Sequence, residues 1–277
     1  MITELGFVLP NNWGLPDPGP VIDLAVEAEA AGLGSVWVNH HVLNVGYIEE
    51  RLDTRPYHDA LTVLSWAAAR TERVRLGTSV LVLPYLHPMV LAKTLATLDQ
   101  LSGGRVIAGL GVGSLPEENA ILRVPYDTRG ADADEDIDIM RALWSSPLAD
   151  HDGVRYRFEG LKTGPQPRQD PLPVWIGGSG APARRRAARV GQGWHPMCSA
   201  PGLARRMPSL LEELGRAGRD RWSIVVAPRI DVSQVPDRSA VEAFADAGAD
   251  QLIVGVGSAD LDEIRRGLDH LATLLPS

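Results

Sequence analysis

Short apolar runs alternate with amphipathic stretches about eight times along the chain, and this alternation constrains the fold more than any other feature. The runs are rich in Val, Ile and Leu without strict polar–apolar alternation, which is typical of parallel strands buried on both faces. The predicted strands are residues 5–9, 35–38, 74–83, 106–111, 174–176, 194–197, 223–232 and 251–256.

The stretches between these runs have helical spacing and defined ends. Leu91, Leu95 and Leu98 recur at helical intervals, and a Gly103-Gly104 pair ends that helix. Glycine-containing junctions join helix to strand at residues 31–34, 190–193 and 247–250. Repeated units of this kind predict an α/β fold, namely a (βα)8 TIM barrel forming one domain over residues 1–277. A doubly wound open sheet is the structural alternative.

Three connections are longer than a barrel requires, at residues 42–57, 112–132 and 145–173. The first two follow predicted strands, so they are expected to overhang the carboxyl face, where the active sites of such barrels lie. The third precedes a strand, and its Arg155-Tyr156-Arg157-Phe158 run predicts a small extra strand.

Composition excludes several classes of protein. A net charge of -8 argues against nucleic acid as a partner, because binding to phosphates requires a basic face. Cys198 is the lone cysteine of the 277 residues, so no internal disulfide forms and a reducing cytoplasm is expected. We find no basic leader and no long apolar run, and therefore predict neither a signal peptide nor a membrane span.

His40 and His41 form the sharpest local signal, at the end of a predicted strand. Adjacent strand residues point to opposite faces, so the pair is not expected to share a metal ion, and no metal site is predicted. Either imidazole could act as a general acid or base, because histidine titrates near neutrality. The simpler interpretation is one exposed and one hydrogen-bonded histidine.

Further polar residues and glycines stand at or near the carboxyl ends of the other predicted strands and form a candidate site. They are Asn11, Asn12, Asn39, Thr78, Ser79, Gly113, Ser114, Glu117, Glu118, His195, Arg229 and Asp231.

A glycine-rich turn, Gly177-Gly178-Ser179-Gly180, lies between a predicted strand and a predicted helix. Free backbone N–H groups and a helix start can bind a phosphate there, although a plain tight turn explains the same residues. Arg184, Arg185 and Arg186 follow, and three consecutive helical positions cannot all face one ligand. A solvated helix face is the simpler interpretation of that run.

Several segments together resemble the bacterial luciferase-like monooxygenase superfamily. The segments are RVRLGTSVLVLP at 73–84, LDQLSGGR at 98–105, MRALW at 140–144 and PLPVWIGG at 171–178, followed by Gly193-Trp194. They occur in the family's order between about residue 5 and residue 200, and the last third matches only as a barrel pattern.

The resemblance implies a barrel that binds FMN or coenzyme F420 at its carboxyl mouth. In such proteins the third strand carries a bulge with a non-proline cis peptide, here Ser79–Val80, against which the ring leans. Gly177, Gly178 and Ser179 would hold the cofactor phosphate. We expect the remaining cofactor contacts from Asn39, Thr78, Ser79, Val80, Gly113 and His195.

The resemblance also implies that His41 acts in proton transfer beside the reacting ring. Many relatives have an acidic residue immediately before that histidine, where this chain has His40, and the role of His40 stays open. Glu117 and Glu118 both stand near the family's acidic position after the fourth strand. The expected catalytic residues are His41, His40 and Glu118.

The short chain and the Asn39-His40-His41 segment look most like the small F420-dependent members, with FMN as the alternative cofactor. Arg184 or Arg185 would suit the anionic tail of F420. The predicted function is hydride transfer between the deazaflavin C5 and a small organic substrate. An FMN-dependent monooxygenase is the alternative, and the family often forms homodimers.

Two other classes are retained as rivals. A metal-dependent barrel hydrolase would need a His-x-His after the first strand, where this chain has Pro10-Asn11-Asn12. A non-catalytic cofactor-binding protein would leave no room for a substrate.

Overall fold

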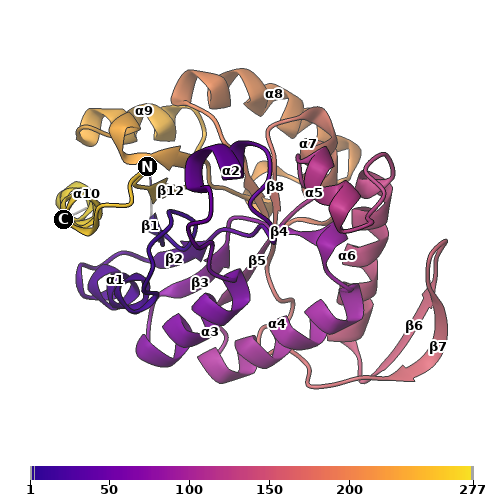
Figure 1. Cartoon of the computed structure of the whole chain (residues 1–277). Helices are drawn as coiled ribbons and strands as arrows, with labels where there is room; N and C mark the ends of the chain where they lie inside the picture. The colour runs from indigo at the N-terminus through magenta and orange to yellow at the C-terminus, as the bar shows by residue number, and fades with distance from the viewer. Residues whose placement is uncertain (1, 3, 276–277) are drawn as a thin grey trace.

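The computed structural model describes residues 2 and 4–275, in which a ring of parallel strands is enclosed by helices (Figure 1). The barrel strands are β1 (Glu4–Val8), β2 (Ser35–Val38), β3 (Arg75–Thr78), β4 (Leu81–Val82), β5 (Val106–Gly111), β8 (Val174–Gly177), β9 (Gly193–His195), β10 (Val225–Val226), β11 (Arg229–Asp231) and β12 (Gln251–Gly255). Each predicted strand overlaps one or two of these.

The helices follow the strands in alternation. They are α1 (Gly19–Ala30), α2 (Tyr47–Leu52), α3 (Ala60–Arg70), α4 (Pro88–Ser102), α5 (Pro116–Ile121), α6 (Arg129–Ser145), α7 (Ala181–Val190), α8 (Ala200–Arg216), α9 (Arg238–Asp246) and α10 (Leu261–Leu274). The predicted stop at Gly103 is confirmed, because Gly103 has the left-handed φ of 76° at the end of α4.

The ring closes between β9 and β12. β10 pairs with β9, and β11 pairs with β12, which in turn pairs with β1. A parallel bridge between Met197 and Arg229 joins the two halves. With β3–β4 and β10–β11 each taken as one broken strand, the described residues form eight parallel strands. The predicted (βα)8 barrel is confirmed, and the doubly wound alternative is wrong.

Two predicted strands are broken in the structure. The run at 74–83 divides into β3 and β4 around the cis peptide Ser79–Val80, which confirms the bulge that the resemblance implied. The run at 223–232 divides at Ala227-Pro228, and proline has no backbone N–H to donate to a ladder. Apolar character continues across both breaks, so the sequence pattern does not reveal them.

Two tryptophans fill the inside of the barrel. Trp37 and Trp175 have ring centroids 5.0 Å apart and pack with Ile107. Glycine in the adjacent strands makes this packing possible, because a Cβ on Gly77 would lie 2.2 Å from Trp37 and one on Gly193 would lie 2.4 Å from Trp175. The interior is therefore a packed core, and ligand space is confined to the carboxyl end.

The three long connections take different positions. The first contains α2, which crosses over the barrel strands in Figure 1, and the second contains α5. The third forms a hairpin of β6 (Leu148–Asp152) and β7 (Arg157–Lys162) that projects away from the barrel. The predicted extra strand near residue 157 is thus confirmed. No helix within the described residues is long and apolar enough to cross a bilayer.

Candidate active site

A cavity of about 370 Å³ opens at the carboxyl ends of the strands and brings most predicted site residues together. His41, Ser79 and Gly177 line it jointly, although they lie on different strands or loops. Its other lining residues are Asn12, Asn39, His40, Tyr47, Arg51, Tyr57, Val80, Val82, Gly111, Val112, Gly113, Ser114, Gly178, Met197 and Arg229.

His41 is held by a buried carboxylate. Its Nδ1 lies 2.6 Å from Glu118 Oε2, while Glu118 Oε1 accepts the backbone N–H groups of Val42 and Leu43 at 2.7 and 3.0 Å. Burial alone would raise the pKa of Glu118, but these three hydrogen bonds outweigh it and lower that pKa. An ionised Glu118 only accepts, so His41 Nδ1 donates to it.

The other nitrogen of His41 faces the loop above the cavity. Its Nε2 lies 3.1 Å from the hydroxyl of Tyr47, at the start of α2. With Nδ1 protonated, a neutral His41 accepts at Nε2, so the Tyr47 hydroxyl donates. Glu118, His41 and Tyr47 therefore form one oriented chain that ends at the cavity.

His40 is fixed differently from its neighbour. The backbone N–H of Val82 donates to His40 Nδ1 at 3.2 Å, which places the ring proton on Nε2. Burial lowers the pKa of His40 to about 4, so the ring is neutral. Both histidines line the same cavity, which corrects the expectation of opposite faces: β2 ends at Val38, and strand alternation does not extend to residues 40 and 41.

A second polar chain lies beneath the cavity. His195 Nδ1 lies 2.6 Å from the carbonyl of Ala227 and therefore donates to it, so His195 Nε2 accepts from the Ser79 hydroxyl at 2.8 Å. Burial lowers the pKa of His195 to about 4. Its ring stacks on Trp37 at a centroid distance of 5.2 Å. His195 thus orients Ser79 from below and is not itself among the cavity-lining residues.

The wall beside Ser79 is apolar and lacks side chains at two positions. A Cβ on Gly177 would lie 2.7 Å from Val80 Cγ1, and one on Gly111 would lie 2.5 Å from Val80 Cγ2. Gly178 has φ 106°, which an L side chain rarely adopts. These glycines leave room for the Val80 side chain and present no side chain of their own beside it.

Two residues predicted to contact the cofactor donate their hydroxyl groups to backbone carbonyls instead. Thr78 is buried and donates its hydroxyl to the carbonyl of Gly109 at 2.7 Å. Ser179 donates its hydroxyl to the carbonyl of Met197 at 2.8 Å, while its own carbonyl accepts from Arg184. Neither residue lines the cavity, so their cofactor contacts stay predictions. Glu118 is likewise absent from the cavity-lining residues, and it contacts the site through its hydrogen bond to His41.

Ten lining residues are absent from the predicted set of catalytic and cofactor residues, and four of these, Tyr47, Arg51, Tyr57 and Arg229, carry a phenol or a guanidinium group. Arg229 was recognisable as a polar residue at a strand end, whereas the other three lie in the 42–57 connection with no local motif. The length of that connection was the available signal. Burial raises the pKa of Tyr57, which keeps its hydroxyl protonated.

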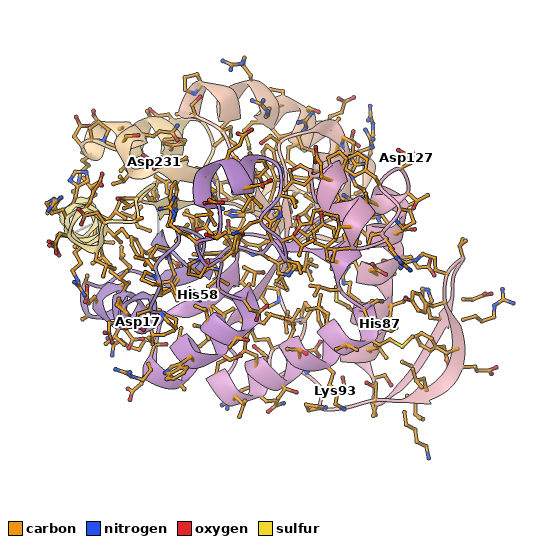
Figure 2. The ribbon with its side chains drawn as sticks, viewed as in Figure 1. Asp17, His58, His87, Lys93, Asp127 and Asp231 are labelled. Carbon is orange, nitrogen blue, oxygen red and sulfur yellow. The ribbon has the colours of Figure 1, made fainter. Side chains whose placement is uncertain are left out.

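The positive charge of the mouth comes from arginine. Lys93 and Lys162 are the two lysines of the chain, and Figure 2 shows Lys93 on the outer helix α4, away from the mouth. Arg51 and Arg229 line the cavity. Figure 2 also labels Asp231, which follows Arg229 by two residues on β11.

Comparison with known sequences gives consistent matches. The family model described as luciferase-like monooxygenase matches residues 4–272. An F420-dependent glucose-6-phosphate dehydrogenase of Kineococcus radiotolerans is 34% identical over 216 residues, which cover 75% of this chain and 61% of that protein. An uncharacterized protein of Mycobacterium tuberculosis is 34% identical over 219 residues, covering 78% of this chain and 76% of that protein.

A solved structure supports the fold. An F420-dependent secondary alcohol dehydrogenase, in complex with an F420–acetone adduct, superposes with a TM-score of 0.85 at 20% identity. The superposition covers 100% of this chain and 99% of that one. At this identity the likeness shows a shared architecture.

Proposed function

The chain belongs to the luciferase-like monooxygenase family, and from this premise we propose that it is an oxidoreductase dependent on coenzyme F420. It transfers hydride between the deazaflavin C5 and a small organic substrate, and His41 transfers the accompanying proton. The observation that carries this proposal is the Glu118–His41 pair, whose histidine lines the same cavity as Ser79, Val80 and Gly177. The name of the Kineococcus relative supports the choice of cofactor.

The cavity fits a planar ring with a phosphate-bearing tail. Its volume of about 370 Å³ lies within the range typical of ligand sites. The Val80–Gly177 wall is apolar, and the backbone of Gly178 lies beside it, next to the turn that precedes α7. Ser79, Val80, Gly177 and Gly178 would hold the ring and the start of the tail. When bound, the deazaflavin supplies a two-electron hydride donor or acceptor at C5.

His41 is oriented for proton transfer at Nε2. Because Nδ1 donates to Glu118, the lone pair of Nε2 is the basic position that reaches the cavity. In the oxidation of an alcohol, His41 Nε2 would accept the O–H proton, and the C–H hydride would pass to the C5 position of the deazaflavin that Ser79, Val80 and Gly177 would hold, which leaves a carbonyl. The Tyr47 hydroxyl occupies Nε2 in this structure, so the substrate oxygen replaces Tyr47 or bonds through it.

FMN remains the second candidate cofactor, because the matching family model is described as a monooxygenase family. FMN would direct the same cavity toward oxygen activation. The position of the ring against the Val80–Gly177 wall and the orientation of His41 would be the same.

Equilibrium binding of the two cofactors tests the proposal. Purified protein is titrated separately with F420 and FMN, and cofactor fluorescence is recorded. We expect F420 to bind at least about tenfold more tightly, which corresponds to about 1.4 kcal/mol. Reduction of bound F420 by a panel of alcohols then reports hydride transfer. Tight binding of FMN without binding of F420 would contradict the cofactor assignment.

A further inference from the structure

A second cavity, of about 430 Å³, adjoins the first at the carboxyl ends of β11 and β12. The two cavities share Arg51, Met197 and Arg229 in their walls. The second cavity also contacts Trp13 and Asp231. A molecule in the second cavity therefore lies next to the Ser79 end of the first, with two arginines between them.

Only one nitrogen of the Arg229 guanidinium group donates hydrogen bonds to described residues. Its Nη1 donates to Asn39 Oδ1 and to the carbonyl of Ser79, the latter at 3.0 Å. Its Nε and Nη2 donate to no atom among the residues that the structure describes. Burial and the neighbouring charge of Arg51 lower the pKa of Arg229, whereas Tyr57 opposes this. The guanidinium is thus fixed along one edge, and its other edge is left for a ligand.

Arg51 approaches the same place from α2. Its guanidinium stacks on the Trp13 ring, with Cζ 4.6 Å from the ring centroid, and its Nη2 donates to the carbonyl of Asn12 at 3.2 Å. Its Nε is buried without a hydrogen-bond partner in the structure. A buried N–H without an acceptor is costly, and a bound anion would satisfy it.

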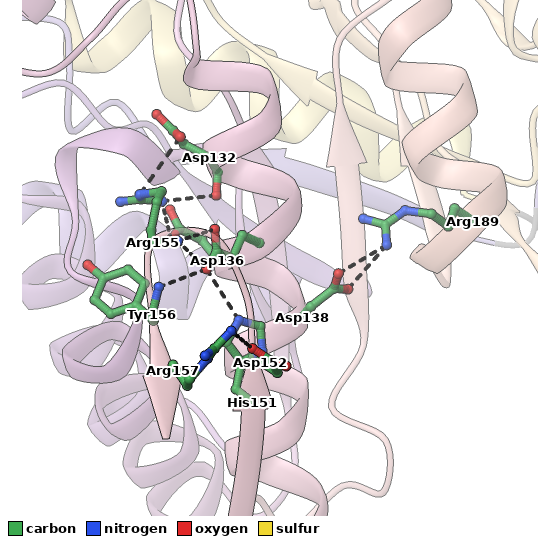
Figure 3. Close-up of polar contacts among 10 residues, drawn as sticks. Asp132, Asp136, Asp138, His151, Asp152, Arg155, Tyr156, Arg157 and Arg189 are labelled. Atoms are coloured by element: carbon green, nitrogen blue, oxygen red, sulfur yellow. Dashed lines mark hydrogen bonds and ion pairs between the residues drawn. The ribbon is translucent and has the colours of Figure 1, made fainter. Parts of the chain in front are cut away.

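Some arginines elsewhere in the molecule have carboxylate partners, whereas others, such as Arg105 and Arg219, donate to several backbone carbonyls. Figure 3 shows Arg155 with Asp132 and Asp136, and Arg189 with Asp138. Within residues 2 and 4–275, neither Arg51 nor Arg229 forms an ion pair. Two neighbouring cations at the wall of a cavity repel each other and lose hydration, so their arrangement favours an anion between them.

Asp231 does not neutralise the pair. One of its carboxylate oxygens accepts the backbone N–H and the hydroxyl of Ser233 at 3.0 and 2.7 Å, within the turn after β11. It forms no ion pair with the described arginines. The cavity is therefore lined by two arginines that attract an anion and by one carboxylate that disfavours a second anion.

We propose that Arg51 and Arg229 together bind the carboxylate or phosphate group of the substrate in the second cavity. This assigns to the substrate an anionic group a short distance from the carbon that exchanges hydride. The identification of the anion with a substrate rests on the proposed function, whereas the binding of an anion does not. Planar guanidinium groups suit both oxyanions, because they donate two parallel hydrogen bonds.

Calorimetry on the cofactor-free protein tests the anion site. The probes are inorganic phosphate, benzoate and the neutral benzyl alcohol, each at low ionic strength. The wild-type protein is expected to bind phosphate or benzoate. Arg51→Met is expected to weaken that binding at least about tenfold, since it removes a charge-assisted hydrogen bond to the anion. Benzyl alcohol should bind equally to both proteins.

Arg73→Met is the matched control, because Arg73 is exposed and precedes β3 at the opposite end of the barrel. It removes the same charge and should leave anion binding unchanged. Arg229→Met provides a second variant, with circular dichroism to verify folding. Should Arg229→Met fail to fold, Arg51→Met still decides the question, since the side chain of Arg51 bonds only to the Asn12 carbonyl among the described residues.

Competition with the cofactor tests whether the arginines bind an anionic group of the substrate or an anionic group of F420. If the arginines hold the substrate, saturating phosphate leaves the affinity for F420 unchanged. If phosphate and F420 exclude each other, the arginines serve the cofactor and the substrate assignment is wrong. Equal anion binding by wild type and Arg51→Met would overturn the site itself. Failure of F420 to bind would contradict the proposed function and leave the calorimetric result standing.

Discussion

Two histidine–glutamate pairs in this molecule have nearly the same local design. At the mouth, Glu118 accepts from His41 Nδ1 and from two consecutive backbone N–H groups, those of Val42 and Leu43. Beside the hairpin, Glu135 contacts His151 Nε2 at 3.3 Å and accepts the backbone N–H groups of Arg155 and Tyr156. In both places a carboxylate on a helix fixes a loop, and hydrogen bonds lower its pKa against the effect of burial.

The surroundings of the two pairs differ. His41 presents its second nitrogen to a cavity, whereas His151 packs on Phe158 and lies beside the ion pairs of Arg155 shown in Figure 3. The arginines near the hairpin are paired with aspartates, whereas those near His41 have no carboxylate partner in the described part of the chain. The same hydrogen-bond motif therefore serves structure where its charges are satisfied, and it can serve chemistry where a cavity and unpaired cations adjoin it.

Among the variants, replacements of the two histidines should differ most from each other in turnover. His41→Asn is expected to lower the turnover of F420 reduction by about 10²–10⁴, because it removes the proton acceptor. His151→Asn should leave turnover unchanged. Steady-state kinetics with an alcohol that reduces F420, together with F420 titration, measures both effects. Equal turnover in His41→Asn and wild type would remove His41 from the mechanism.

The buried histidine below the cavity should give the next largest effect, on stability. The folded pKa of His195 is about 4 and the ordinary value is 6.5, so the unfolded chain binds more protons between these values. Stability therefore falls as the pH drops below about 6.5. At pH 5 the loss due to this group is about 2 kcal/mol relative to pH 8. Urea unfolding of wild type and His195→Asn at both pH values measures the loss.

His151→Asn serves as the control for this pH dependence. It should keep the wild-type decrease in stability between pH 8 and pH 5, whereas His195→Asn should show a smaller decrease. A pH dependence that is the same in all three proteins would show that His195 is not buried in its neutral form.

Glu118 should control turnover, whereas Glu135 should control the free energy of unfolding. Glu118→Gln is expected to lower turnover at least about tenfold, because a neutral amide no longer stabilises a protonated His41. Glu135→Gln should leave turnover intact and lower the free energy of unfolding by about 1–2 kcal/mol, through weaker hydrogen bonds to the hairpin. Kinetics and urea unfolding on both variants test this, and a loss of turnover in Glu135→Gln would contradict it.

Tyr47 should have the smallest effect. Tyr47→Phe removes one hydroxyl hydrogen bond to His41 Nε2, a change of about 0.5–1.5 kcal/mol. We expect turnover to change by less than about tenfold and the pH profile of turnover to shift, since Nε2 becomes free in the unliganded enzyme. Tyr156, beside the hairpin, offers Tyr156→Phe as a control with no change in the profile.

Much of the fold could be predicted because its determinants are local. Runs of Val, Ile and Leu and the glycines at helix ends encode strands and stops within a few residues, and the order of the units then predicts the barrel. The breaks at Ser79–Val80 and Pro228 were harder to place, because apolar character continues across them. The resemblance located the first of these breaks.

The candidate site was predictable in part. His41, Ser79, Val80, Gly177 and Gly178 stand at strand ends, and strand ends of a parallel barrel meet at one face. The roles of Thr78, Ser179 and His195 could not be read from the sequence, because their partners, the carbonyls of Gly109, Met197 and Ala227, lie on other segments.

The sequence by itself determined the alternation of elements, the face on which the site lies and the residue types present there. Tertiary structure alone decided which of these residues touch. Glu118 meets His41 across 77 positions of chain, and Arg229 meets Ser79 across 150. Such pairs form only when the ring closes, because their geometry depends on the packing of the whole barrel and on no spacing within one segment.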